Sequence, residues 1–327
     1  MRAMVMAAGL GTRLRPLTYE VPKPVVPVVN RPVMEHILEL LPGHGFTEAI
    51  SNLHWFPDTI RNRIGDGSSV GVDLTYSYEE DLLGTAGGVR NVADFFGDEP
   101  FLVMAGDALT DIDLTALREA HSRNDGIATL AVKRVANVSE FGVVITGNDG
   151  RIQGFQEKPD PAEALSNLAS CMIYVLEREI FDYFPDRPVV DFALDVFPAL
   201  LENDVPFHVH VIDEYWNDVG SLPEYLQGNL DALEGAVSVN GGGTLLDPAG
   251  SEEAIERGEP GISGPVIVGQ NCELDPSARL DGPLVIGDGC VVGAGARVKQ
   301  SVLLPGSEVP ERAMVAGAVY GRAGALA

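Results

Sequence analysis

Short apolar runs alternate with segments of helical periodicity over residues 1–235. Apolar runs of this length predict buried strands, and seven occur, at Ala3–Ala7, Ala49–Leu53, Leu74–Tyr78, Phe101–Met104, Ile127–Val132, Val143–Thr146 and Met172–Leu176. Between them, apolar residues recur at helical spacing in Pro32–Leu41, Thr59–Ile64, Leu114–His121 and Phe192–Leu201. This alternation predicts a mixed, mostly parallel α/β sheet with helices on both faces. Ligands of such sheets bind outside the carboxyl ends of the strands.

The pattern changes over residues 236–262. Gly241–Gly243, Pro248 and the acidic stretch Glu252–Glu259 are typical of a loosely packed connection. The sequence therefore predicts a catalytic-sized domain over 1–235, a linker over 236–262 and a further domain over 263–327.

A six-residue period runs through the C-terminal segment. Aliphatic residues recur at every sixth position, at Val268, Leu274, Leu280, Ile286, Val292, Val298 and Leu304. Such a period predicts a left-handed β-helix of hexapeptide repeats, in which each repeat forms one side of a three-sided coil. A β-helix buries its core by stacking coils. Because little more than two coils are expected, this one must pack on the first domain or on another subunit.

Composition and charge narrow the class of protein. The 327 residues are 45% hydrophobic and 21% charged, which is typical of a folded globular chain. The formal net charge of −26 argues against nucleic acid or anionic membrane as a partner. It does not argue against a phosphate ligand, because remote charges are screened beyond about 8 Å at physiological salt.

The location and the cysteines are read from the same sequence. No apolar stretch approaches the roughly 18 residues of a membrane span, and the short N-terminal apolar run is read as a strand, so we expect a cytoplasmic protein. The three scattered cysteines predict neither a disulfide framework nor a zinc site.

A glycine-rich, basic loop follows the first predicted strand. It reads Ala7-Ala8-Gly9-Leu10-Gly11-Thr12-Arg13-Leu14-Arg15-Pro16-Leu17-Thr18, and Val21-Pro22-Lys23-Pro24 comes soon after. Glycines let the backbone approach phosphate oxygens, and Arg13 and Lys23 supply a planar fork and a point charge for them. The loop matches neither the Rossmann fingerprint nor the P-loop. The alternative is a structural turn with surface cations.

This string resembles the GxGTRLxPLT…PKP signature of the sugar nucleotide pyrophosphorylases, the sugar-1-phosphate nucleotidyltransferases. The resemblance continues over about 230 residues, and the hexapeptide tail is similar to that of the longer members. It implies a Rossmann-like α/β domain and Mg²⁺-assisted transfer of a nucleoside monophosphate from a nucleoside triphosphate to a sugar-1-phosphate. It also implies that Ala8, Gly9, Gly11 and Thr12 bind the nucleotide, and that Arg13 and Lys23 hold the triphosphate and the departing pyrophosphate.

Two aspartates distant in sequence are candidate metal ligands. Asp107 follows an apolar strand and Gly106, and Asp218 lies between Asn217 and Val219. Mg²⁺ is usually held by one or two carboxylates, with phosphates and water completing its shell. Both settings resemble the metal-binding aspartates of the family. For Asp111 and Asp113 the sequence instead favours capping of a helix or turn.

The resemblance also assigns the base and sugar subsites. Leu83–Gly88 resembles the base-recognition segment, which implies that Gly84, Thr85 and Gly87 bind the nucleotide, and Asn52 and His54 are weaker candidates for the same pocket. Gly142, Glu157 and Lys158 resemble the residues that bind the sugar phosphate. One departure concerns Met172, because family members commonly have glycine two residues before the tyrosine that is Tyr174 here. A methionine at this position is expected to narrow the sugar pocket.

Several alternatives remain at this point. The motifs favour GTP and mannose-1-phosphate as substrates, with a glucose-1-phosphate thymidylyl- or uridylyltransferase as the second choice. A non-catalytic paralogue that binds a nucleotide sugar is a third, although it would be expected to lack phosphate or metal ligands. An acyltransferase role for the repeats is disfavoured because no histidine follows His210. We expect the β-helix to serve as a subunit interface in a homo-oligomer.

Overall fold

The computed structural model describes residues 1–246 and 260–326, so Pro248 and Glu252–Glu259 of the predicted linker lie outside the described residues. The chain forms two compact units, each made of separate segments. The first comprises Met1–Leu10, Ile37–Ala108 and Ile112–Trp216, and the second comprises Gly11–His36, Leu109–Asp111 and Asn217–Ala327. The glycine-rich loop is therefore divided between the units.

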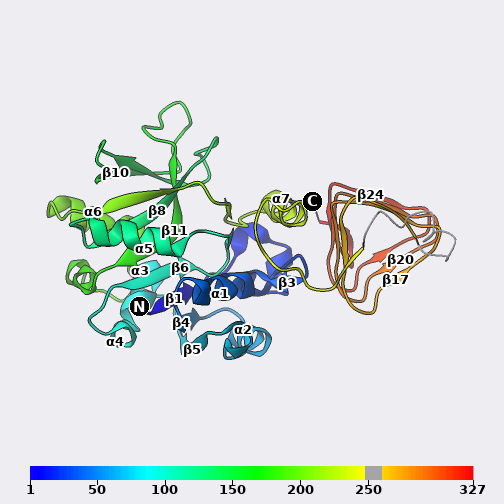
Figure 1. Cartoon of the computed structure of the whole chain (residues 1–327), viewed down its shortest axis with the longest axis horizontal. Helices are drawn as coiled ribbons and strands as arrows, with labels where there is room; N and C mark the ends of the chain where they lie inside the picture. Colours follow the sequence, from blue (N-terminus) through cyan, green and yellow to red (C-terminus); the bar gives the residue numbers. More distant parts are fainter. Residues whose placement is uncertain (247–259, 327) are drawn as a thin grey trace. The chain divides into compact units, whose positions relative to one another are not determined.

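A nine-stranded sheet forms the centre of the first unit (Figure 1). Strand β1 (Ala3–Met6) lies between β4 (Glu48–Leu53) and β6 (Phe101–Ala105) and is parallel to both. Strand β5 (Asp73–Tyr78) extends this parallel part beyond β4. Because the chain leaves β1 toward neighbours on both sides, the carboxyl end of β1 is the place where ligands of such sheets bind.

The rest of the sheet is largely antiparallel. Strand β11 (Leu168–Leu176) is antiparallel to β6, to β8 (Ala128–Arg134) and to β9 (Gly142–Thr146). Strand β10 (Ile152–Glu157) pairs with β9, and β12 (His208–Ile212) is parallel to β8. The predicted mixed α/β sheet is thus confirmed, and β10 and β12 are additions to the predicted strands.

Helices α1 (Val33–Gly43), α2 (Pro57–Ile64) and α5 (Leu114–Arg123) correspond to predicted helices. The predicted capping role of Asp113 is confirmed, because its carboxylate accepts hydrogen bonds from the amides of Thr115 and Ala116 at the start of α5, both 2.9 Å. The predicted helix at Phe192–Leu201 is instead a π-helical turn, Phe192–Val196, followed by α6 (Phe197–Glu202). Helices α3 (Gly84–Arg90), α4 (Ala93–Phe96) and α7 (Leu222–Leu233) complete the set within the described residues.

One aromatic core lies behind the antiparallel part of the sheet. Tyr174, Phe192 and Phe197 are buried, and their ring centroids lie 5.3–5.5 Å apart. Burying a side chain of this size stabilises a fold by about 1.5–3 kcal/mol. This core fixes β11 against the segment that carries the π-helical turn.

The C-terminal part of the second unit is a β-helix, as predicted. Its strands stack in three parallel sheets. The sheets contain β15 (Gly261–Ser263), β18 (Arg279–Asp281), β21 (Arg297–Lys299) and β24 (Met314–Ala316); β16 (Val266–Val268), β19 (Leu284–Ile286), β22 (Val302–Leu303) and β25 (Val319–Gly321); and β17 (Glu273–Leu274), β20 (Val291–Val292) and β23 (Glu308–Val309). Strands β14 (Thr244–Leu246) and β26 (Gly324–Ala325) pair antiparallel with β16 and β25. The segment 236–262, predicted as a linker, therefore includes β14 and part of β15.

The predicted period holds up to Val298 and then slips by one residue. Val268 pairs with Ile286, but Ile286 pairs with Leu303 rather than with the predicted Leu304. The cause is a corner that is one residue shorter, since Asp281 pairs with Lys299 whereas Val285 pairs with Val302.

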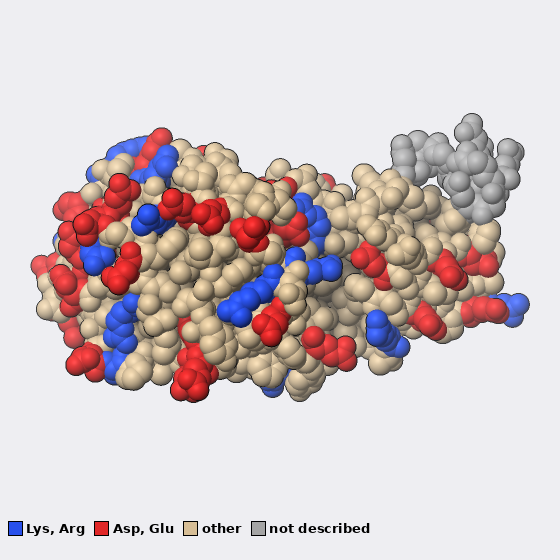
Figure 2. All heavy atoms as spheres, turned by 90° about the horizontal axis from the view of Figure 1, so that it is seen from below, with Lys and Arg blue, Asp and Glu red and all other residues tan. Residues whose placement is uncertain are grey.

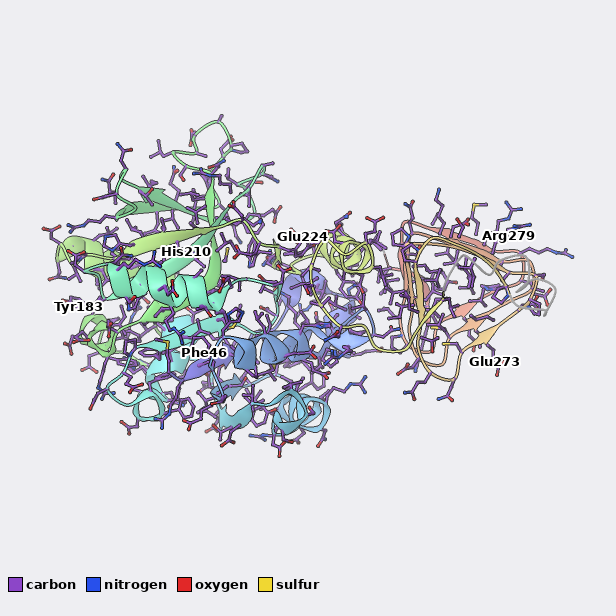
Figure 3. The ribbon with its side chains drawn as sticks, viewed as in Figure 1. Phe46, Tyr183, His210, Glu224, Glu273 and Arg279 are labelled. Atoms are coloured by element: carbon purple, nitrogen blue, oxygen red, sulfur yellow. The ribbon has the colours of Figure 1, made fainter. Side chains whose placement is uncertain are left out.

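Side chains alternate between the inside and the outside of the coils. Leu280 is fully buried in the core of the β-helix, whereas its neighbour Arg279 and the rung residue Glu273 are exposed and point outward (Figure 3). Figure 2 shows acidic side chains spread over the face that it displays, with fewer Lys and Arg between them. No helix among the described residues is long and apolar enough to cross a membrane.

Candidate active site

The carboxyl ends of β1, β4 and β6 meet in the first unit. The amide of Ala7, just after β1, donates a hydrogen bond to Asn52 Oδ1 of β4 (2.9 Å). The amide of Gly106 donates to the carbonyl of Met6 (2.9 Å), and a Cβ at position 106 would lie only 2.8 Å from a Val5 methyl. Glycine therefore lets β6 end against β1, and Asp107 leaves the sheet beside the first residues of the loop.

The next loop residues leave room for a ligand. A Cβ added at Gly9 would meet no protein atom within 4 Å. Ala8 precedes it and is buried. Open space beside a glycine at the carboxyl end of β1 suits the close approach of a phosphate group.

In the second unit the loop turns back on itself at Gly11. Gly11 has φ 61°, and its carbonyl accepts hydrogen bonds from Thr18 Oγ1 (2.7 Å) and from the Leu14 amide (3.1 Å). A Cβ at Gly11 would lie 3.0 Å from Lys23 Cβ. Thr12 opens the short 3₁₀ turn Thr12–Leu14. The turn is thus packed against the stem of Lys23.

Arg13 and Lys23 both contact Asp218, which lies about 200 residues away in the sequence. Arg13 Nη2 lies 3.1 Å from Asp218 Oδ2, and Lys23 Nζ donates to the Asp218 carbonyl oxygen at 2.7 Å. The Gly220 amide donates to Asp218 Oδ1 (3.2 Å). The Lys23 side chain is buried, and that of Arg13 is 49% exposed. Two cationic side chains thus meet at one carboxylate, and Arg and Lys side chains are the groups that bind phosphate oxygens through charge-assisted hydrogen bonds.

The candidate metal ligands Asp107 and Asp218 lie in different units, and both are partly buried. The side chain of Asp218 is 18% exposed, so a carboxylate oxygen can be reached by an ion. Within residues 1–246 and 260–326 no group of three or more His, Cys, Asp or Glu side chains forms a metal cage. A site of one or two carboxylates fits Mg²⁺, which keeps water and phosphate oxygens in its shell.

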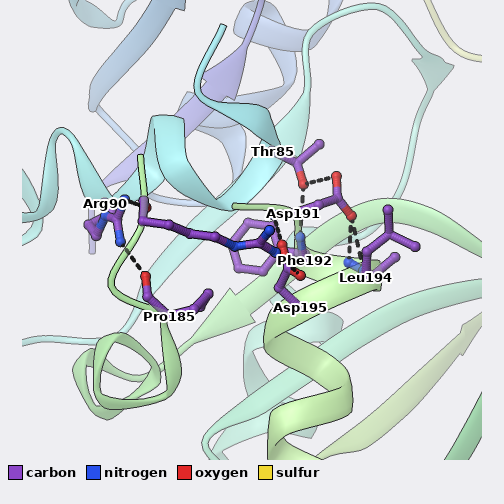
Figure 4. Close-up of polar contacts among 9 residues, drawn as sticks. Thr85, Arg90, Pro185, Asp191, Phe192, Leu194 and Asp195 are labelled. Carbon is purple, nitrogen blue, oxygen red and sulfur yellow. Dashed lines mark hydrogen bonds and ion pairs between the residues drawn. The ribbon is translucent and has the colours of Figure 1, made fainter. Parts of the chain in front are cut away.

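The segment Leu83–Gly88 lies at the start of α3, and its Thr85 side chain lies beside Asp191 (Figure 4). A Cβ at Gly84 would overlap the Val190 carbonyl, and one at Gly87 would lie 3.3 Å from the Val190 amide nitrogen. Thr85 Oγ1 donates to Asp191 Oδ2 (2.8 Å). The need for glycine at these two positions is therefore explained by contacts within the protein.

Glu79, which sequence reasoning missed, lies next to this segment. It follows β5, is buried, and accepts hydrogen bonds from Asn52 Nδ2 (2.7 Å) and from the Leu83 amide (3.2 Å). His54 Nδ1 lies 3.0 Å from the Glu79 carbonyl oxygen. A Cβ at Gly88 would lie 2.6 Å from Glu79 Oε1. The sequence signal was an acidic residue directly after a strand and before a glycine-rich helix start.

The predicted sugar-binding residues come together on the β9–β10 hairpin. Gly142 pairs with Glu157, and a Cβ at Gly142 would lie 3.2 Å from Glu157 Oε2. Lys158 has φ 45°, and its amide donates to the Phe141 carbonyl (3.1 Å). The Phe141 ring packs on Trp216 with centroids 5.4 Å apart. One end of this hairpin therefore presents a carboxylate and an ammonium group from consecutive residues.

Met172 lies at an irregularity in the neighbouring strand. The register between β11 and β8 shifts between Ser170 and Tyr174, and Met172 has φ 56°. Its sulfur accepts a hydrogen bond from Tyr174 Oη (3.1 Å). Glycine adopts such a φ without steric cost, so the backbone supplies a reason for the glycine that the resemblance expects at this position.

Comparison with known families covers most of the chain. Residues 2–235 match the family described as "Nucleotidyl transferase". The chain belongs to this nucleotidyl transferase family. Residues 262–326 match a second family model, described as "GMPPB C-terminal domain". The resemblance to the sugar nucleotide pyrophosphorylases is thereby confirmed, and the protein is a sugar-1-phosphate nucleotidyltransferase.

Individual relatives differ in the substrates that their names give. The chain is 37% identical over 297 residues to a UTP–glucose-1-phosphate uridylyltransferase of Synechocystis, covering 86% of this chain and 76% of that one. It is 34% identical over 285 residues to a mannose-1-phosphate guanylyltransferase of Mycobacterium tuberculosis, covering 85% and 78%. A solved structure of a putative glucose-1-phosphate thymidylyltransferase from Bacillus anthracis matches with TM-score 0.65 at 25% identity, covering 74% of this chain and 97% of that chain.

Proposed function

We propose that the enzyme joins GTP and mannose-1-phosphate to give GDP-mannose and pyrophosphate. The observation that carries the phosphate chemistry is the convergence of Arg13 and Lys23 on Asp218. For the substrate pair, support comes from the similarity to the mycobacterial guanylyltransferase and from the match of the C-terminal segment to the "GMPPB C-terminal domain".

In the proposed reaction an oxygen of the sugar-1-phosphate attacks the α-phosphorus of GTP, and the bond between that phosphorus and the α–β bridging oxygen breaks. No general base is needed, because the second pKa of a phosphate monoester is about 6 and the attacking group is already largely dianionic at neutral pH. The obstacle is the repulsion of two anions and their alignment. Residues that hold both anions in place therefore supply the catalysis.

We assign the roles as follows. Arg13 and Lys23 hold the triphosphate and the departing pyrophosphate, and Lys158 holds the sugar phosphate. Asp107 and Asp218 would hold Mg²⁺, which supplies positive charge to the phosphate oxygens when bound. Gly142 and Glu157 contact the hydroxyl groups of the sugar. The nucleotide is contacted by the backbone and small side chains of seven residues, Ala8, Gly9, Gly11, Thr12, Gly84, Thr85 and Gly87.

Glu79 is our candidate for a residue that positions the base-binding segment. Its side chain is buried, and it accepts hydrogen bonds from Asn52 Nδ2 and from the Leu83 amide. Glu79 therefore fixes Asn52 and the start of α3 from inside the protein rather than contacting the base itself. A hydrogen bond to a charged group contributes about 1.5–3 kcal/mol. Glu79→Gln is therefore expected to raise KM for GTP at least tenfold while KM for mannose-1-phosphate changes little.

The second candidate pair is UTP and glucose-1-phosphate, which the 37% identity to the Synechocystis uridylyltransferase favours. Pyrophosphate release with Mg²⁺, measured for four nucleoside triphosphates against mannose-1-phosphate and glucose-1-phosphate, separates the two. Turnover confined to GTP and mannose-1-phosphate supports the proposal, and turnover with UTP and glucose-1-phosphate replaces it. No turnover by folded protein that binds a nucleotide sugar would favour a regulatory paralogue.

Two further expectations stay predictions. A homo-oligomer is checked by light scattering on the full chain, and a cytoplasmic location by fractionation of the source cells. Neither result changes the assignment of the phosphate-binding residues.

A further inference from the structure

A strained two-residue turn lies close after Lys23 in the second unit. Strands β2 (Pro27–Val28) and β3 (Arg31–Pro32) form a hairpin whose turn is Val29 and Asn30. Both residues have positive φ, 42° and 66°. Two-residue hairpin turns of this kind favour Asn-Gly or similar pairs, and a β-branched residue in this region is a steric outlier. Such a conformation persists only where its surroundings hold it.

Helix α7 and the segment around Gly242, both outside the hairpin, hold Val29 in this conformation. The Val29 amide donates to Asn229 Oδ1 (2.8 Å), and the Val29 carbonyl accepts from the Gly242 amide (2.8 Å). Asn229 is fully buried in α7, and its Nδ2 donates to the Tyr225 carbonyl (2.8 Å). Tyr225 Oη in turn donates to the Pro27 carbonyl (2.6 Å). Helix α7 therefore grips the hairpin at two points.

The turn also contacts the β-helix directly. Asn30 Nδ2 donates to the Ile286 carbonyl at 2.9 Å, and Ile286 ends strand β19. A Cβ at Gly241 would lie 2.5 Å from Ile267 Cδ1, so the segment that bonds Val29 itself packs against β16. The hairpin tip is thus tied to two rungs of the β-helix.

The hairpin is joined to Lys23 by a short, stiff segment. Lys23 opens the 3₁₀ turn Lys23–Val25, the Val26 amide donates to the Lys23 carbonyl (3.1 Å), and the Val33 amide, after the hairpin, donates to the Val26 carbonyl (3.0 Å). Pro24 and Pro27 lie in this stretch, and each proline fixes its own φ. Displacement of the turn is therefore passed to Lys23 rather than absorbed between them.

We propose that the β-helix braces the segment that carries Lys23 through the Val29–Asn30 turn, and that Asn30 is a positioning residue for Lys23. The proposal rests on the role of Lys23 given above. It assigns the C-terminal repeats a part in the reaction without placing any of their residues at the substrate. The contact that carries it is the hydrogen bond from Asn30 to Ile286.

The test is Asn30→Gly in the full chain, because glycine keeps the positive φ and removes only the amide. The matched control is Asn271→Gly, since Asn271 also has positive φ (55°) and lies exposed on the β-helix. For Asn30→Gly we expect kcat for pyrophosphate release to fall about tenfold, within the range for mutations that alter coupling between distant sites. KM for mannose-1-phosphate and Tm are expected to match those of the control.

Asn30→Asp serves as a second variant, because a carboxylate cannot donate to the Ile286 carbonyl, and it should show the same loss of kcat. Parent-like kcat in both Asn30 variants would overturn the proposal, as would a loss that Asn271→Gly shares. Lys23→Ala, measured in parallel, tests the proposed role of Lys23 separately from the proposed brace through Asn30. An inactive Lys23→Ala with active Asn30 variants removes only the brace, whereas a fully active Lys23→Ala removes the proposed role of Lys23.

Discussion

Replacing Gly220 by alanine is expected to perturb the contact between Arg13 and Asp218 without straining the backbone. The φ angle of Gly220 lies outside the left-handed region, so an L residue fits its backbone. The added Cβ would, however, lie 2.6 Å from Asp218 Oδ2 and 2.8 Å from Arg13 Nη1. The methyl group therefore separates the two side chains whose contact carries the proposed chemistry.

The size of the effect follows from these distances. Van der Waals contact between such atoms begins at about 3.4 Å, so the carboxylate must move by about 0.8 Å and the guanidinium by about 0.6 Å. Misplacement of a positioning group by about 1 Å costs on the order of 100-fold in rate. We expect kcat to fall by roughly 10- to 100-fold, or about 1.4–2.7 kcal/mol of activation free energy. Because a half-exposed ion pair contributes at most about 1 kcal/mol to stability, Tm should fall by less than about 4 °C.

Steady-state pyrophosphate release and thermal unfolding of the same preparations measure both quantities. Gly43→Ala is the matched control, because a Cβ at Gly43 meets no atom within 4 Å and its φ is also ordinary. Parent-like kcat in Gly220→Ala would refute the reasoning. So would a loss of kcat accompanied by a fall in Tm far beyond that limit, because the defect would then be one of folding.

Three other predictions concern single residues. Gly9→Ala should leave Tm unchanged, because the space beside it is open, and should raise KM for GTP about tenfold, or roughly 1.4 kcal/mol; an unchanged KM would place the phosphates elsewhere. Met172→Gly should be more stable to urea than Met172→Ala by about 1 kcal/mol, since alanine retains the cost of the positive φ; the reverse order would contradict the strain. Burial lowers the pKa of His121, although Glu177 raises it. In the unfolded chain a histidine has a pKa of about 6.5, so on acidification the unfolded state takes up a proton at a higher pH than the folded state does. The free energy of unfolding should therefore be constant above about pH 6.5 with respect to this group and should decline as the pH falls below that value. His121→Gln should reduce the slope of Tm against pH between 6.5 and 5.5, and an equal slope would exclude His121 as its source.

Much of the sheet could be predicted because its buried strands are uninterrupted apolar runs. Strands β10 and β12 were missed because Gly154 interrupts the first and histidines alternate with valines in the second. Helix α7 was missed although Ser221 and Glu224 have the spacing of a capping box, and Ser221 Oγ accepts a hydrogen bond from the Glu224 amide at 3.4 Å. That signal is local and was available.

The site could be predicted only in part. Arg13 and Lys23 lie in one short stretch of sequence that forms a recognisable motif, and Asp218 was identified from the residues next to it. The sequence did not predict that Arg13 and Lys23 contact Asp218, because the fold brings these distant residues together. Glu79 carries no motif of its own, and its role depends on burial beside Asn52. Long-range convergence of this kind is set by the topology and leaves no periodic trace.

The most direct test of the central claim is the dependence of pyrophosphate release on Mg²⁺ concentration in the parent, Asp107→Asn and Asp218→Asn. If the two aspartates hold the ion beside Arg13 and Lys23, each substitution should lower kcat by about 100-fold or more and raise the Mg²⁺ concentration needed for half-maximal rate. Turnover within a factor of a few of the parent, at the same Mg²⁺ requirement, would contradict the account.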